Sequence, residues 1–141
     1  MIKIDIYNDS DLSIDSKSIE KFVTLIIQDH GYSSAIINLI ITDDEALRKM
    51  KKKYFNQDYY TDVIAFNIEK DPFEGEIYIS YDRVKNNASQ YNQSFQKEFK
   101  RVIIHGLLHL YGYKDSTNNE KIKMTSLEEK FLKKFNENIL N

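Results

Sequence analysis

Apolar and polar residues follow two different periods in the first part of the chain. Isoleucine occupies every second position from 2 to 6, which is typical of a half-buried strand. From about 15 to 30 the apolar residues recur at helical spacing, and Gly31 is placed to end that helix. The short β-branched run 35–42 predicts a strand covered on both faces.

The central part of the chain predicts another helix and a pair of strands. Thr42 and Glu45 have the spacing of a capping box, which would open a short helix to about Lys53. Strands are expected at 62–68 and 75–80, joined closely enough to form a hairpin.

Three further helices complete the pattern, capped by Ser80, by Ser94 and by Thr117 with Glu120. The last one is expected to bury four apolar residues: Met124, Leu127, Phe131 and Phe135. The order predicts one α+β domain over residues 1–141, with a mixed four-stranded sheet and about five helices packed on it.

Composition narrows the chemistry of the chain. Its 141 residues suit one domain, and the absence of cysteine excludes disulfides and thiolate ligands. No apolar run approaches the ~20 residues of a membrane helix, and the N-terminus has no hydrophobic signal core. We therefore expect a cytoplasmic protein without membrane contact. The net charge of −2 means that an RNA partner would need a local basic patch.

The stretch HGLLHLYGYKDS holds the strongest candidate for chemistry. His105 and His109 lie four residues apart on one helix face, where two imidazoles can bind one ion. Gly112 allows the chain to turn back, so that Asp115 becomes the third ligand. Three N/O ligands with an open fourth position are typical of catalytic zinc. The alternative is an ordinary core helix followed by an Asp that only caps the next one.

This spacing is that of the metzincin proteases, with one departure. The residue after the first histidine is Gly106 rather than the glutamate that serves a peptidase as general base. We therefore expect a metal hydrolase that acts on another bond, such as a phosphodiester, and a close approach of some other element at Gly106.

Basic residues near this motif are candidates for RNA contact. Lys51, Lys52 and Lys53 are followed by aromatic residues that can stack on unpaired bases, and Lys97 lies on the metal helix. Arg101 lies one turn before His105, within reach of a scissile phosphate. The alternatives are a solvated lysine face, and an arginine that pairs with acidic side chains.

The acidic neighbours of the metal helix leave two possibilities open. Arg101 has Glu98 or Glu128 as candidate partners. Glu98 itself would either orient an imidazole of the site or be an ordinary surface acid.

The chain resembles the YbeY family of bacterial endoribonucleases in HGLLHLYGYKD, YYTDVIAF, GEIYISYDRVKNNA and MTSLEEK, from about Leu47 to Leu132. The resemblance implies a zinc-dependent endonuclease specific for single strands. It also implies action on the 3′ end of small-subunit rRNA and in ribosome quality control, with the small ribosomal subunit and its proteins as partners. We expect a monomer or a weak oligomer.

Two residues depart from the family pattern. Asp115 replaces the usual third histidine, which makes the site more anionic and admits Mn²⁺ or another divalent ion. Phe55 stands where members usually have an arginine, and we hypothesise that Arg101 partly replaces it. Two other functions stay open: a zincin-type metallopeptidase, and a non-enzymatic ribosome-assembly module that retains the metal site.

Overall fold

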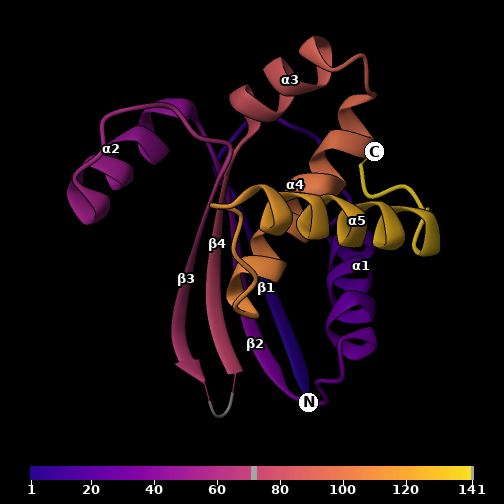
Figure 1. The fold of residues 1–141 in the computed structure, drawn as a ribbon. Helices are drawn as coiled ribbons and strands as arrows, with labels where there is room; N and C mark the ends of the chain where they lie inside the picture. The colour runs from indigo at the N-terminus through magenta and orange to yellow at the C-terminus, as the bar shows by residue number, and fades with distance from the viewer. Residues whose placement is uncertain (71–72, 141) are drawn as a thin grey trace.

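A four-stranded mixed sheet forms the centre of the protein in the computed structural model, which describes residues 1–70 and 73–140 (Figure 1). The elements follow the predicted order: β1 (Ile2–Asn8), α1 (Ser16–Asp29), β2 (Ala35–Thr42), α2 (Asp44–Phe55), β3 (Val63–Lys70), β4 (Phe73–Ser80), α3 (Tyr81–Gln90), α4 (Phe95–Leu110) and α5 (Asn118–Lys134). The predicted α+β class, with four strands and five helices, is confirmed.

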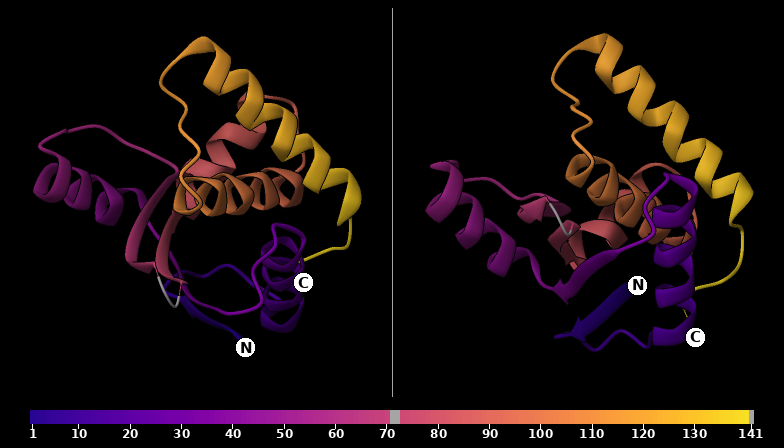
Figure 2. Two further views of the ribbon diagram at one scale, coloured as in Figure 1. Left: turned by 60° about the horizontal axis from the view of Figure 1, so that its bottom comes forward. Right: turned by 90° about the horizontal axis from the view of Figure 1, so that it is seen from below.

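The strand order is β1-β2-β4-β3. β1 and β4 pair with β2 in parallel, and β3 pairs with β4 as an antiparallel hairpin, as predicted. α1 and α4 cover one face of the sheet, and α5 crosses α4 on the side away from the sheet (Figure 2). α2 projects beyond the β3 edge.

The expectation that β2 is covered on both faces is wrong. Ala35, Ile37, Leu39 and Ile41 are fully buried, while the residues between them are only half-buried. The reason is that α1 and α4 pack on a single face.

The predicted helix caps hold with one exception. Ser80, Ser94 and Thr117 accept hydrogen bonds from the backbone of their helices, and Thr117 forms the capping box with Glu120. The cap of α2 is not Thr42, however. Thr42 still pairs with Ser80 in the sheet, so the helix begins one residue later and Asp43 accepts from the Ala46 N–H at 2.8 Å.

The predicted core of α5 is confirmed in part. Met124 and Phe131 are buried, whereas Leu127 is half-buried and Phe135 is the half-buried C-cap residue. The buried face holds α5 against α4, and this contact brings a distant part of the chain to the histidines.

Candidate metal centre

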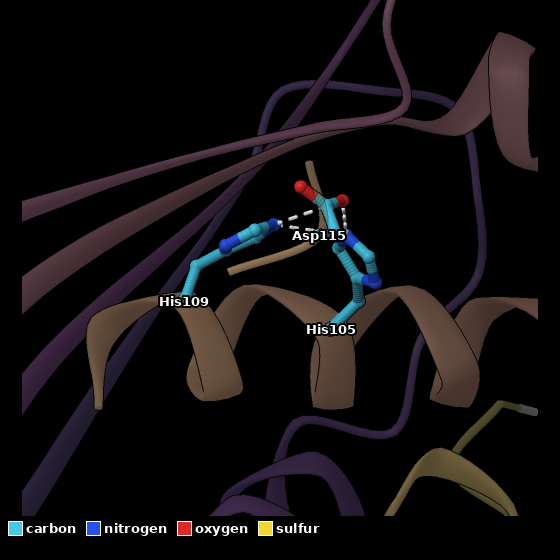
Figure 3. Close-up of side chains that lie close together, drawn as sticks. All are labelled: His105, His109 and Asp115. Atoms are coloured by element: carbon cyan, nitrogen blue, oxygen red, sulfur yellow. Dashed lines mark hydrogen bonds and ion pairs between the residues drawn. The ribbon is translucent and has the colours of Figure 1, made fainter. Parts of the chain in front are cut away.

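His105 and His109 lie one turn apart on α4 and point into the same space (Figure 3). Their Nε2 atoms are 3.0 Å apart. Most of α4 is buried, so the helix backbone that carries both rings has little freedom to move. The side chains are 19% and 32% exposed, which leaves their Nε2 atoms open to a ligand.

The turn after α4 brings a carboxylate to the two rings. Gly112 has φ +95°, a left-handed conformation that side chains disfavour, so the chain reverses there as predicted. Asp115 Oδ2 then lies 3.2 Å from Nε2 of His105 and 3.5 Å from Nε2 of His109. One ligand atom from each of the three residues lies within 4.8 Å of the others, which is an arrangement that can hold a metal ion.

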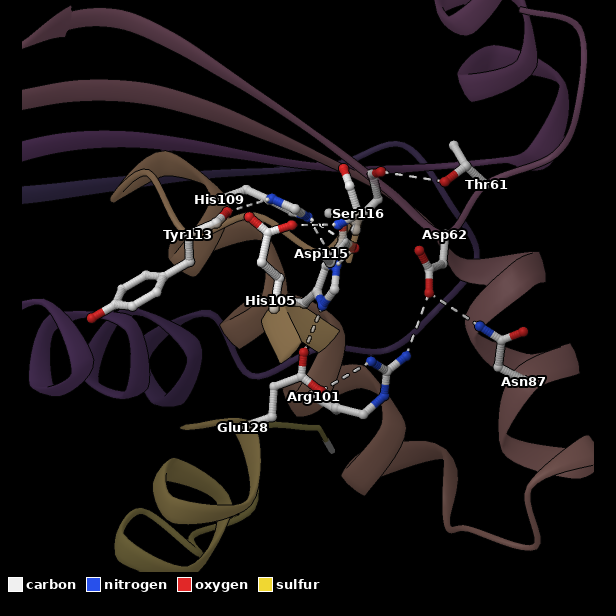
Figure 4. Close-up of polar contacts among 12 residues, drawn as sticks. Thr61, Asp62, Asn87, Arg101, His105, His109, Tyr113, Asp115, Ser116 and Glu128 are labelled. Atoms are coloured by element: carbon white, nitrogen blue, oxygen red, sulfur yellow. Dashed lines mark hydrogen bonds and ion pairs between the residues drawn. The ribbon is translucent and has the colours of Figure 1, made fainter. Parts of the chain in front are cut away.

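The opposite nitrogen of each ring fixes its tautomer. Nδ1 of His109 donates to the Tyr113 carbonyl at 3.0 Å, and Nδ1 of His105 donates to Oε2 of Glu128 at 2.5 Å (Figure 4). Both Nε2 atoms therefore present lone pairs to one another and to Asp115. Such a group of acceptors is stabilised by a cation between them, so the residues fit a divalent ion.

The charges around His105 favour a positive charge on or beside its imidazole ring. Burial of the ring works against protonation, but the hydrogen bond to Glu128 and the nearby carboxylates of Glu128, Asp62 and Asp115 raise the pKa of His105 above its usual value. The site therefore attracts a cation before any ligand is considered.

Arg101 occupies the centre of a partly buried acidic network behind His105. Its guanidinium donates to both carboxylate oxygens of Glu98, at 2.8 and 2.6 Å. It also donates to Glu128 and to Asp62, each at 3.4 Å. The hydrogen bonds that Arg101 donates to Glu98 raise the pKa of the guanidinium above its ordinary value. Both acidic partners considered from the sequence are thus present.

Glu98 has neither of the two roles expected from the sequence. It is only 2% exposed, so it is no surface acid, and it pairs with Arg101 rather than with an imidazole. The partner of His105 is Glu128, which comes from α5 because the imidazole turns towards that helix. Asp62 accepts from Asn87 at 3.1 Å as well as from Arg101, as a structural acceptor near the site would.

Glu128 is the residue that the sequence interpretation missed as a partner of the metal centre. A signal was available, because it lies four residues after Met124 and three before Phe131, on the buried face of α5. An acid at such a position needs a partner, and it is 3% exposed here.

Gly106 explains why no glutamate follows the first histidine. A Cβ added there would lie 2.9 Å from Cγ2 of Ile77 and 3.2 Å from Cγ2 of Val63. The position therefore faces the sheet rather than the histidines, and its close approach lets α4 pack against β3 and β4. The close approach expected at Gly106 is confirmed.

The three candidate ligands line a cleft of about 510 Å³. Thr61 to Ala65 form its floor, and Lys51, Phe55 and Tyr59 form the other wall. Of the four lysines predicted to contact RNA, Lys51 thus lines the cleft.

The other three lysines lie elsewhere on the surface. Lys52 and Lys53 are exposed on the last turn of α2. Lys97 lines a separate hollow, together with Arg101 and Glu128.

The sheet, the helix with two histidines and the returning carboxylate define an α+β domain with a candidate metal centre in an open polar cleft. Comparison with known proteins identifies the family to which this domain belongs. Residues 5–136 match the family model described as Endoribonuclease YbeY. The chain belongs to the YbeY endoribonuclease family, and the resemblance seen in its motifs is confirmed.

Relatives that carry the name Endoribonuclease YbeY cover most of the chain. One from Flavobacterium psychrophilum is 41% identical over 115 residues, which are 81% of this chain and 82% of the relative. One from Chlorobium phaeobacteroides is 32% identical over 133 residues, 94% of each chain. A solution structure of a Thermotoga maritima protein has a TM-score of 0.65 at 26% identity, covering 96% of this chain and 89% of that one.

None of the helices in the described part of the chain has both the length and the apolar character that crossing a bilayer requires.

Proposed function

We propose that the protein is a metal-dependent endoribonuclease that cuts single-stranded RNA and acts in maturation of the 3′ end of small-subunit rRNA and in ribosome quality control. Membership of the YbeY family supports the reaction and the substrate. The single observation that carries the metal dependence is the convergence of two Nε2 lone pairs and one carboxylate on a point in an open cleft.

His105, His109 and Asp115 are the proposed ligands, with Zn²⁺ as the ion and Mn²⁺ as the alternative that the carboxylate favours. Such an ion supplies Lewis-acid polarisation of a phosphoryl oxygen and lowers the pKa of a water molecule. The chain itself orients the ligands: Glu128 and the Tyr113 carbonyl hold the two Nδ1 protons and so keep both Nε2 atoms turned into the cleft.

The contacts with RNA are proposed for Lys51, Lys52, Lys53 and Lys97, with Lys51 nearest to the ligands because it lines their cleft. Contact between Arg101 and the scissile phosphate stays a prediction. Three carboxylates already contact its guanidinium, so a phosphate would have to compete with them. If Arg101→Ala cleaves RNA as fast as the parent protein, this role is refuted.

We further propose a cytoplasmic protein, monomeric or weakly oligomeric, that works with the small ribosomal subunit and its proteins. Family membership supports this setting. The metallopeptidase alternative is disfavoured, because residue 106 is a glycine packed against the sheet, so the chain lacks the general-base glutamate after the first histidine.

The proposed activity is tested by incubating the protein with single-stranded RNA and, separately, with an unstructured peptide, each with and without a chelator. We expect cleavage of RNA alone and its loss with chelator. His109→Ala is expected to lower the rate by about a thousandfold or more while the protein stays folded. Cleavage of the peptide, or RNA cleavage that His109→Ala leaves intact, would refute the proposal. Rescue of ribosome assembly by folded His109→Ala would favour the non-enzymatic module.

A further inference from the structure

The wall of the cleft opposite the histidines is aromatic and basic rather than purely polar. It is formed by Lys51 and Phe55 near the end of α2 and by Tyr59 in the following loop. Phe55 is 43% exposed and Tyr59 is 50% exposed. Exposed rings that share one cleft with a candidate catalytic site indicate a ligand with an apolar, flat part.

Each of these two rings contacts a neighbouring side chain. Phe55 stacks on Phe66 of β3, with ring centroids 5.9 Å apart and an interplanar angle of 15°. The Tyr59 hydroxyl donates to Oε1 of Gln57 at 2.9 Å. Asn56, in the left-handed conformation at φ 54°, turns the chain from the helix into the loop that carries Tyr59. A surface ordered before binding loses little entropy when a ligand arrives.

Lys51 adds a positive charge beside both rings. Its Nζ lies 4.7 Å from the ring centroid of Phe55 and 5.4 Å from that of Tyr59. Among the described residues that line the cleft it is the one with a permanent positive charge, whereas Asp62 and Asp115, which also line the cleft, are acidic. A phosphate entering the cleft is therefore drawn towards the aromatic wall.

We propose that Phe55 and Tyr59 form a stacking platform for one unpaired base of the RNA strand, with Lys51 holding the phosphate next to that base. This inference rests on the proposed function and deepens it. A base inside a duplex is already stacked on its neighbours and cannot reach the rings, so the platform selects a nucleotide whose base is unpaired. Because every base has a flat face, the platform reads the presence of a base rather than its identity.

The test is the affinity of the protein for a short single-stranded RNA, measured by fluorescence anisotropy in the presence of a chelator so that the strand stays intact. Phe55→Leu keeps the apolar bulk but removes the ring, and we expect about a tenfold loss of affinity. Phe55→Tyr keeps a ring and should bind like the parent protein. Tyr7→Leu is the control, because Tyr7 is an exposed ring on β1, at the opposite edge of the sheet, and does not line the cleft.

A second arm replaces the nucleotides one at a time with abasic ones. At one position the missing base should weaken binding to the parent protein by about tenfold and binding to Phe55→Leu hardly at all, since the partner ring is already gone. The platform is refuted if Phe55→Leu binds like Tyr7→Leu, or if each abasic RNA weakens the binding of both proteins by the same factor.

These results are separable from a failure of the proposed function. If the parent protein binds the RNA but never cleaves it with any divalent ion, the nuclease proposal fails, and the affinity ratios still decide on the platform. If the parent protein binds no single-stranded RNA, both proposals are refuted.

Discussion

The two walls of the cleft are built in opposite ways. The wall that carries His105 and His109, the metal wall, is backed by Glu98 and Glu128, two buried acids held around Arg101. Glu128 also fixes the His105 ring through a hydrogen bond. The opposite wall consists of exposed rings and a lysine on α2, which projects beyond the β3 edge (Figure 2). The comparison teaches that groups which need exact geometry are fixed by the interior, whereas groups that only need to attract a strand stand at the surface.

The largest expected effect is on stability, at the packing contact beneath the metal wall. Gly106→Glu completes the peptidase motif but places a charged side chain against Ile77 and Val63. We expect a loss of about 4 kcal/mol or more in the free energy of unfolding, because the site can accommodate neither the volume nor the charge. Urea unfolding measures it, with Ser126→Glu on the exposed face of α5 as the control. A stable Gly106→Glu protein that cleaves peptides would contradict our account of this glycine.

The next effect concerns the support behind the ligands. Glu128→Gln should weaken ion binding by about ten- to a hundredfold, because it removes the charge that holds Nδ1 of His105. The matched control is Glu129→Gln, which removes the same charge from an exposed position of the same helix. A competition titration with a coloured chelator gives both affinities, and equal values for the two variants would show that Glu128 has no such role.

The smallest effect is expected on the open wall. Lys51→Ala should weaken RNA binding about three- to tenfold and reduce the dependence of the affinity on salt concentration by about one ion. Lys97→Ala should have less effect, because Lys97 lines a separate hollow. The measurement is the binding constant over a series of salt concentrations. If RNA ran along α4 and α5 instead of through the cleft, Lys97→Ala would weaken binding more than Lys51→Ala.

The parts of the site that depend on local sequence could be predicted, and the parts that depend on packing could not. His105, His109 and Asp115 are brought together by one helical turn and by a left-handed glycine, both of which are readable in eleven consecutive residues. Glu128 arrives from α5 through contacts between helices. The sequence places this acid on the apolar face of a helix, but no sequence pattern determines which imidazole it contacts.

In the fold and in the cleft, too, the features that depend on packing could not be predicted from the sequence. The alternating and helical periods predicted the strands and helices, but the one-sided cover of β2 follows from where α1 and α4 pack. Likewise, nothing local separates Lys51 from Lys52 and Lys53. Only the placement of α2 relative to β3 decides that Lys51 faces the ligands.

Whether His105, His109 and Asp115 bind an ion is decided by the metal content of freshly purified protein. We predict about one divalent ion per chain, since three protein ligands converge on one point. Asp115→Ala should lose that ion while keeping its fold, and Ser116→Ala, at the exposed neighbouring position, should retain it. A protein that holds no stoichiometric ion, or an Asp115→Ala variant that holds it as well as the parent, would contradict the account.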